Sequence, residues 1–319
     1  MDLKTYKKQA EFSQLHLLGL SGYTKDEIFQ VLKLALDLKQ KQKKGVAHKL
    51  LEGKVLAMIF AKSSTRTRVS FQSGIYQLGG TGLFLSSNDL QLGRGETLSD
   101  TAKTLSGMVD GIMIRTYKQS DVDALAVYGS IPVINGLTDL LHPCQALADI
   151  MTFYEKVKSF EGKKMCYVGD GNNVAHSLMM ACAKVGLDIS LGCPEDCMLD
   201  PKIIALASSE ARKSGASISI YDEPKRAVNG ADAVYTDVWA SMGEEGKAEE
   251  KHKKLSAFQV NEDLMGFANS DAIFLHCLPA HRGEEVTKEI IDGEKSVVFE
   301  QAENRLHAQK AVMALLMGE

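Results

Sequence analysis

Short apolar runs alternate with stretches of helical spacing along most of this chain, and this alternation restricts the possible folds more than any other feature. The clearest run, Val55–Phe60, is typical of a strand, and the residues after it have helical periodicity. Such alternation favours parallel sheets whose strands are joined by crossover helices. Further strands are expected at 82–85, 111–114, 131–134, 164–168, 188–191, 217–220, 233–236, 272–276 and 297–299.

The pattern stops and restarts near the middle of the chain. Thr24 and Glu27 have the spacing of a capping box, which predicts a first helix that ends before Gly45. A helix over 145–157 closes the first series of strands, and a new series begins at residue 164. We therefore expect an α/β protein with two doubly wound domains, each with a central parallel sheet, joined near residue 150. A final helix over 302–317 is placed to return to the first domain.

Composition excludes several classes of protein. The 319 residues are 45% hydrophobic and 24% charged, and the net charge of −4 provides no overall field for nucleic acid or an anionic membrane. No run approaches the length of a bilayer span and no secretory signal is evident, so a cytoplasmic location is expected. The six cysteines are far apart, and Cys193 and Cys197 lack the partners of a zinc finger. Neither a metal nor a cofactor is expected.

Small hydroxyl side chains and guanidinium groups gather directly after the first apolar run, at Ser64-Thr65-Arg66-Thr67-Arg68. At a strand-to-helix junction, free backbone N–H groups, the positive end of the helix and planar Arg side chains suit phosphate oxygens. The sequence has neither a Walker lysine pattern nor three glycines. A phosphorylated ligand is therefore one interpretation, and a well-capped, solvated helix start is the other.

Polar groups follow several other predicted strands, where ligands of open α/β sheets collect. In the first half these are Arg115 and His142-Pro143-Cys144-Gln145, which suit a charged anion with a polarisable carbonyl. In the second half, carboxylate, amide and thiol groups suit an amine: Asn172-Asn173, Asp237 to Gly243, and His276-Cys277-Leu278-Pro279. Cys277 is also explained as a small buried residue. Gly169-Asp170-Gly171 lacks the third glycine of a dinucleotide-binding loop.

Four motifs in this order resemble those of the ornithine carbamoyltransferases: Ser64 to Arg68, His142 to Gln145, Asp237 to Gly243, and His276 to Pro279. The first two are general to transcarbamylases, whereas Asp237, Ser241-Met242-Gly243 and Cys277 resemble the ornithine branch. The resemblance covers essentially the whole chain. It implies a carbamoyl-phosphate-binding domain at 1–150, joined by the C-terminal helix 302–319, and an ornithine-binding domain at 151–301. The active site is then expected in the cleft between the two domains.

The reaction that this resemblance implies is transfer of the carbamoyl group of carbamoyl phosphate to the δ-amine of L-ornithine, giving L-citrulline and phosphate. Catalytic roles are implied for Arg115, His142, Asp237 and Cys277. Binding of carbamoyl phosphate is implied for Ser64, Thr65, Arg66, Thr67, Gln91, Arg115, His142, Pro143, Cys144, Gln145, Cys277, Leu278 and Arg305. Binding of ornithine is implied for Asn173, Asp237, Ser241 and Met242. No cofactor is implied.

Several alternatives remain open at this level. Arg305 is as well explained by pairing with Glu303 or another surface carboxylate. The segment 88–96 reads as a surface loop, although the resemblance implies that its Gln91 reaches a neighbouring subunit in a trimer or a multiple of trimers. The acceptor is also open between ornithine and another amine, such as putrescine or a modified ornithine. A non-catalytic ligand-binding relative with the same fold is the rival from another class.

Overall fold

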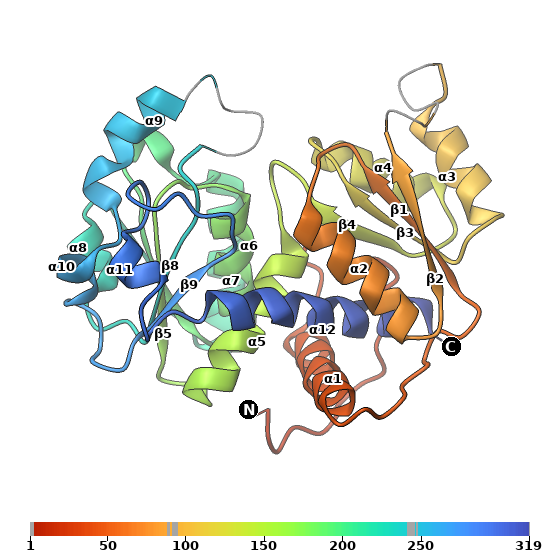
Figure 1. Ribbon diagram of the computed structural model, residues 1–319, viewed down its shortest axis with the longest axis horizontal. Helices are drawn as coiled ribbons and strands as arrows, with labels where there is room; N and C mark the ends of the chain where they lie inside the picture. Colours follow the sequence, from red (N-terminus) through yellow and green to blue (C-terminus); the bar gives the residue numbers. More distant parts are fainter. Residues whose placement is uncertain (1–2, 88–89, 91–94, 241–245, 247, 319) are drawn as a thin grey trace. The chain divides into compact units, whose positions relative to one another are not determined.

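The computed structural model describes residues 3–87, 90, 95–240, 246 and 248–318. The chain divides into two compact units. The amino-terminal unit comprises residues 6–148 and 304–319, and the carboxy-terminal unit comprises residues 1–5 and 149–303. The chain passes from one unit to the other between residues 5 and 6, and again within the helices α5 (Pro143–Val157) and α12 (Val298–Met317) (Figure 1).

The amino-terminal unit has a parallel sheet in the order β2-β1-β3-β4. Its strands are β1 (Val55–Phe60), β2 (Thr81–Ser86), β3 (Gly111–Arg115) and β4 (Val133–Leu137), and its helices are α1 (Lys25–Lys43), α2 (Thr65–Gln77), α3 (Leu98–Ser106) and α4 (Gln119–Tyr128). From β1 the chain moves outward to β2 and then returns to the other side of β1 for β3 and β4. The direction in which strands are added to the sheet therefore switches between β1 and β3. Ligands of such sheets bind at the carboxyl ends of the strands beside this switch point.

The carboxy-terminal unit has a five-stranded parallel sheet in the order β7-β6-β5-β8-β9. Its strands are β5 (Lys164–Val168), β6 (Asp188–Gly192), β7 (Ile218–Tyr221), β8 (Ala233–Thr236) and β9 (Ile273–His276). Its helices are α6 (Asn173–Val185), α7 (Pro201–Ser214), α8 (Pro224–Val228), α9 (Ala248–Leu255), α10 (Glu262–Met265) and α11 (Lys288–Ile291), with 3₁₀ turns at Glu195–Cys197 and Ser256–Phe258. Here the direction switches between β5 and β8.

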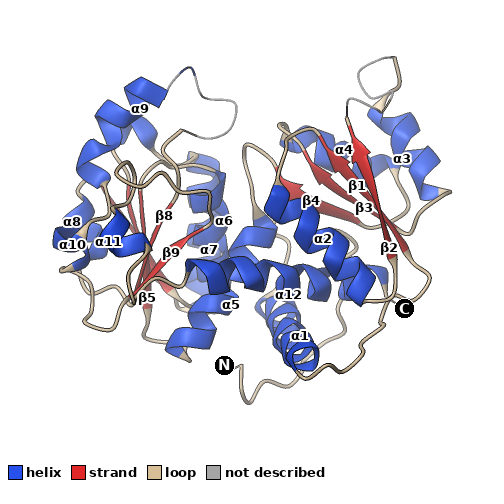
Figure 2. Ribbon diagram, in the orientation of Figure 1, coloured by secondary structure: helices blue, strands red, loops and turns tan. Residues whose placement is uncertain are grey.

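Helices pack against both sheets, as Figure 2 shows for the strands in red and the helices in blue, although the edge strand β2 has only exposed and half-buried residues. In the amino-terminal unit, alternate residues of β1 such as Ala57 and Ile59 pack with apolar residues of α3 and α4. In the carboxy-terminal unit, Cys166 and Val168 of β5 pack with residues of α8 to α11. Apolar residues on both faces explain why these strands appear in the sequence as continuous apolar runs.

The expected fold class is confirmed, because both units are α/β with parallel sheets. The capping box is also confirmed: Glu27 N–H donates to the Thr24 hydroxyl (3.1 Å), and the Glu27 carboxylate accepts from Thr24 N–H (2.8 Å). Strands β7 and β9 begin one residue later than expected, and β4 begins two residues later, at Val133, after Pro132, which has no N–H to donate to a ladder. No helix in the described ranges has both the length and the apolarity needed to cross a bilayer.

The strand expected at 297–299 is wrong, because Val298 and Phe299 begin α12 and Val297 lies just before it. Only one bridge, between Ser296 and Phe274, links it to β9. Phe299 is 70% exposed, as a solvent-facing helical residue is, and the helix formers Glu300, Gln301 and Ala302 continue the turn. Three apolar residues were too short a pattern to separate a strand end from a helix start, and α12 therefore begins four residues earlier than expected.

Candidate active site

The start of α2 lies directly after β1, beside the switch point of the amino-terminal sheet. Ser64 caps the helix: its hydroxyl accepts from Thr67 N–H (3.2 Å) and lies 3.0 Å from the Thr67 hydroxyl. Thr67 is fully buried, Arg66 is half-buried and Thr65 is exposed. Both sequence interpretations therefore describe the same residues, because the capped helix start also presents hydroxyl and guanidinium groups at the carboxyl end of β1.

Arg305 of α12 joins this group from the far end of the chain. It is buried, and its two terminal nitrogens donate to the Gln145 side-chain oxygen (2.8 Å) and to the Thr67 hydroxyl (3.0 Å). The alternative in which Arg305 pairs with a carboxylate on the exposed surface is therefore wrong, because the side chain is buried. These bonds bring α2, α5 and α12 together at one place within the amino-terminal unit.

His142 lies immediately before α5 and is the electrostatic centre of this group. It is buried, and its pKa lies well below 6.5 because of burial first, followed by the positive charges of Arg305, Arg115 and Arg66. The imidazole is therefore neutral near neutral pH, and a neutral imidazole with one N–H is suited to polarise a carbonyl oxygen. We call Ser64, Thr67, Arg66, Arg115, His142, Gln145 and Arg305 the anion cluster.

Pro143 and Cys144 form the first turn of α5, beside the anion cluster. The Cys144 thiol is buried and donates to the Asn135 carbonyl of β4 (3.4 Å). Burial raises the pKa of Cys144 to about 12, so the thiol stays protonated. The side chain of Cys144 is thus committed to the β4 backbone.

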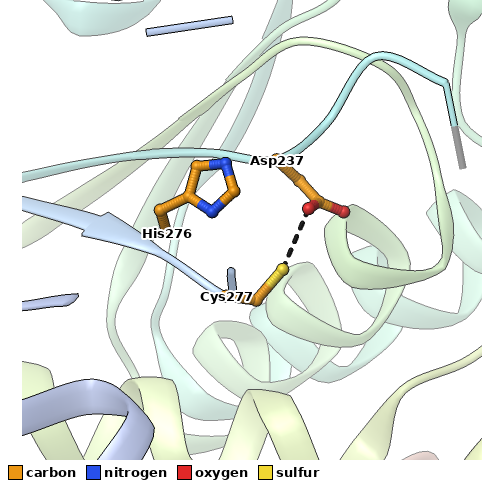
Figure 3. A group of neighbouring side chains, drawn as sticks. All are labelled: Asp237, His276 and Cys277. Atoms are coloured by element: carbon orange, nitrogen blue, oxygen red, sulfur yellow. Dashed lines mark hydrogen bonds between the residues drawn. The ribbon is translucent and has the colours of Figure 1, made fainter. Parts of the chain in front are cut away.

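In the carboxy-terminal unit, polar groups converge after β5, β8 and β9. The Cys277 thiol donates to one carboxylate oxygen of Asp237 (2.9 Å), as Figure 3 shows. The Asn172 amide donates to the other carboxylate oxygen (2.8 Å). Asp237 is buried and Cys277 is half-buried. We call Asn172, Asp237 and Cys277 the thiol cluster.

The sequence offered Asn172 and Asn173 together as amide groups after β5, but the resemblance assigned the binding role to Asn173 alone. The Asn172 side-chain oxygen caps α6 by accepting from Val174 N–H (3.0 Å) and Ala175 N–H (3.1 Å). This cap leaves its NH₂ group for Asp237. The preference for Asn at a helix N-cap was the sequence signal that would have selected the first asparagine of the pair.

The Gly169-Asp170-Gly171 turn is explained by packing. A Cβ atom on Gly171 would lie 2.6 Å from the backbone of Cys197 and Leu199, so only glycine fits beside this loop. The position after it is occupied by the Asn172 cap. These contacts account for the glycine without a dinucleotide.

Comparison with known proteins identifies the family to which both clusters belong. The carbamoyl-P binding domain of the aspartate/ornithine carbamoyltransferases matches residues 15–155, and the Asp/Orn binding domain of the same family matches residues 161–316. The chain belongs to the aspartate/ornithine carbamoyltransferase family.

Individual members of this family are similar over nearly their full length. Ornithine carbamoyltransferase of Thermococcus kodakarensis is 57% identical over 302 residues, which cover 95% of this chain and 96% of the relative. That of Oceanobacillus iheyensis is 55% identical over 98% of this chain and 97% of the relative. The solved structure of ornithine carbamoyltransferase from Pyrococcus furiosus has a TM-score of 0.94 and 55% identity, and covers 97% of this chain and 99% of that one.

The thiol cluster also bears on whether this member of the family could hold a metal ion. Donor atoms of Asp237, His276 and Cys277 lie within 4.8 Å of one another. However, the Leu278 N–H donates to Nδ1 of His276 (2.8 Å), and Nε2 of His276 lies 3.1 Å from the Glu285 carboxylate. Both ring nitrogens are therefore engaged, and His276 could bind a metal only if one of these bonds were broken. His281, Glu284 and Glu285 form a second group with similar spacing.

The remaining expected site residues differ in what the structure describes. Leu278 is partly buried against the core of the carboxy-terminal unit, and Asn173 is the first residue of α6. Three others, Gln91, Ser241 and Met242, lie outside the described residues.

Proposed function

We propose that this protein is an ornithine carbamoyltransferase, which transfers the carbamoyl group of carbamoyl phosphate to the δ-amine of L-ornithine to give L-citrulline and phosphate. The observation that carries this proposal is near-full-length identity of 57% to a protein named for that activity. Ornithine carbamoyltransferase of Pyrococcus furiosus, also 57% identical, carries the further description anabolic. The activity places the protein in arginine biosynthesis.

The anion cluster binds carbamoyl phosphate in this proposal. The phosphate group sits at the start of α2, where Ser64, Thr65, Thr67 and backbone N–H groups donate hydrogen bonds and Arg66 supplies charge. Arg115 and the neutral His142 donate to the carbonyl oxygen as negative charge develops on it. Gln145 and the Cys277-Leu278 backbone are assigned to the carbamoyl nitrogen, while Arg305 both fixes Gln145 and adds a positive charge. Loss of one such donor costs about 3 kcal/mol of transition-state stabilisation.

The thiol cluster binds and prepares the amine. Ornithine reaches the enzyme as a cation at its δ-nitrogen and must lose one proton before it can attack. Asp237 and Cys277, held together at 2.9 Å, are the groups assigned to this nitrogen, with Asn173, Ser241 and Met242 on the rest of the amino acid. The uncharged amine then attacks the carbonyl carbon, the carbon–oxygen bond to phosphate breaks, and the nitrogen releases a second proton.

The assembly and location of the protein are also proposals. We propose a homotrimer or a multiple of trimers, in which Gln91 of each chain contributes to a neighbouring carbamoyl phosphate site. A cytoplasmic location is favoured by the cysteines, since all six are free thiols, as expected in a reducing compartment.

A steady-state assay of the purified protein tests the proposed function. Citrulline should form from carbamoyl phosphate and L-ornithine, and the value of kcat/KM should be far higher for ornithine than for putrescine, acetylornithine or aspartate. A preference for another amine would replace ornithine as the acceptor. No product with any of the four amines would favour a ligand-binding protein instead.

A further inference from the structure

A fully buried histidine and carboxylate lie directly behind the thiol cluster. Neither His276 nor Glu285 has exposed surface, and His276 Nε2 lies 3.1 Å from a Glu285 oxygen. The same oxygen accepts the His281 N–H (2.7 Å). Burying two polar side chains is costly unless they are hydrogen-bonded, so this pair requires a reason beyond packing.

The partners of His276 fix the position of its proton. Nδ1 lies 2.8 Å from the Leu278 backbone nitrogen, which can only donate, so Nδ1 is the acceptor. The ring proton is then on Nε2, where it is donated to Glu285. With both nitrogens engaged in this way, His276 has no lone pair left for the Cys277 thiol, and that thiol donates to Asp237 instead.

Leu278 is the residue that this arrangement holds. Its φ of +58° is in the left-handed region, which residues other than glycine, asparagine and aspartate seldom occupy. A left-handed residue next to a candidate active site persists only where its surroundings hold it. Two contacts do so here: the bond from its N–H to His276, and the packing of its side chain against the core of the carboxy-terminal unit.

We propose that His276 and Glu285 are positioning residues: Glu285 orients the His276 ring, and the ring holds the Leu278 backbone so that the Cys277 thiol and the Leu278 carbonyl keep their reactive placement. This inference rests on the proposed carbamoyl transfer and adds two residues to it. His276 acts through the Leu278 backbone, and neither His276 nor Glu285 carries a proton to or from a substrate.

The backbone of His276 has its own anchor, which allows the role of the ring to be tested separately. His276 N–H donates to the Gln301 side chain (2.9 Å), and Gln301 in turn donates to Asp149 (2.7 Å). A substitution that changes only the ring leaves these bonds in place. The end of β9 should therefore keep its position in variants of His276.

Two substitutions of His276 separate its two ring contacts. In His276→Asn the amide oxygen takes the place of Nδ1 and can still accept the Leu278 N–H, but the contact with Glu285 is lost. In His276→Gln the amide reaches the place of Nε2 and Glu285, but the acceptor for Leu278 is lost. We expect kcat for citrulline formation to fall about 100-fold in His276→Gln and about tenfold or less in His276→Asn, with KM for ornithine changing less than about threefold.

Glu285→Gln distinguishes positioning from proton transfer. The glutamine oxygen can accept from both His276 and His281, so positioning predicts kcat within about threefold of the parent and an unchanged pH profile, whereas a proton relay predicts a loss of about 100-fold. Melting temperatures of all three variants show whether losses follow stability instead. The proposal is overturned if His276→Gln is as active as His276→Asn, if kcat follows the melting temperature, or if Glu285→Gln loses the activity. If the parent protein forms no citrulline, the proposed function fails before this comparison begins.

Discussion

The chemical role of Cys277 depends on its hydrogen bond to Asp237. Its thiol is half-buried and donates to Asp237, which Asn172 holds from the other side. A thiol placed in this way can control the proton of an attacking amine. Its contribution should therefore appear in the chemical step.

Cys277→Ala is expected to lower kcat about 100-fold while the affinity for carbamoyl phosphate stays within about threefold, because general acid–base groups contribute roughly that factor. Steady-state kinetics and equilibrium binding of carbamoyl phosphate provide the two values. Cys193→Ala is the matched control, since Cys193 is a buried thiol of the same unit outside the thiol cluster. Unchanged turnover in Cys277→Ala would remove the proposed role.

His142 should remain neutral throughout the physiological range. Its pKa is lowered from 6.5 by burial and by the charges of Arg305, Arg115 and Arg66, so the folded protein binds fewer protons at this site than the unfolded chain. The stability contributed by neutral His142 is complete above pH 6.5 and is lost as the pH falls from there towards the lower pKa of the folded state. The imidazole C–H resonances of His142 should not shift between pH 8 and about 6.5; a titration midpoint close to 6.5 would contradict this account.

At the residue scale, the sequence predicted those site groups that directly follow a strand. Arg115, Asp237 and Cys277 were expected because parallel strands end at one edge of a sheet. The environment of Arg305 could not be predicted in this way, since its contacts with Gln145 and Thr67 join positions far apart in the chain and depend on how α12 packs. His276 belonged to the fourth motif, but its role behind Cys277 could not be predicted, because one contact of the ring is a backbone N–H and the other is the buried Glu285 carboxylate.

At the scale of elements, long or fully buried patterns were predicted better than short ones. The strand at Val55–Phe60 matches the expected bounds because five of its six residues are buried. The prediction of a strand at 297–299 failed because the three apolar residues are in different environments. Val297 and Val298 are buried, whereas Phe299 is exposed on α12. Burial of this kind depends on tertiary packing that a short run does not encode.

Helix α12 is held to two other helices by a buried ammonium group, which makes a prediction about stability. Lys310 is fully buried and donates to the side-chain oxygens of Gln42 (2.7 Å) at the end of α1 and of Gln77 (2.8 Å) at the end of α2. His48 Nε2 lies 3.1 Å away. Burial lowers the pKa of Lys310 from 10.5 to about 8, so between these values the unfolded chain binds more protons than the folded one.

The stability of the parent protein should therefore rise with pH across this window, relative to Lys310→Met, in which the titration is absent. Because part of the environment is polar, we expect a gain of only about 1–2 kcal/mol in unfolding free energy between pH 8 and 10. Urea unfolding at several pH values measures it. The control is Lys33→Met, which makes the same substitution at an exposed lysine of α1. A constant difference for Lys310→Met would show that Lys310 does not titrate in this range.

At the scale of the whole molecule, one construction rule is used twice with different chemistry. Each unit has a parallel sheet to which successive strands are added first on one side and then on the other. The change of side falls between β1 and β3 in one unit and between β5 and β8 in the other. Guanidinium and hydroxyl groups follow that point in the amino-terminal unit, and carboxylate, amide and thiol groups follow it in the carboxy-terminal unit. Similar folds can therefore bind an anion in one case and an amine in the other, because specificity lies in the residues after the strands.

The proposed sharing of sites between subunits is a property of the assembly, and it can be tested with two inactive chains. Gln91→Ala removes the group assigned to a neighbour's site, and Arg66→Ala removes a group of the chain's own site. Each homo-oligomer should have little activity. In a mixed oligomer, some sites pair an intact Arg66 with an intact Gln91 from the adjacent chain, so part of the activity should return. Citrulline formation by oligomers that are refolded together and separated by two different affinity tags measures the recovery.

Mixing Arg66→Ala with Arg115→Ala is the control, because both changes lie in the anion cluster of one chain. Recovery in neither mixture would show that each chain builds its carbamoyl phosphate site by itself, and recovery in the control would contradict the assignment of Arg66 and Arg115 to the cluster of one chain.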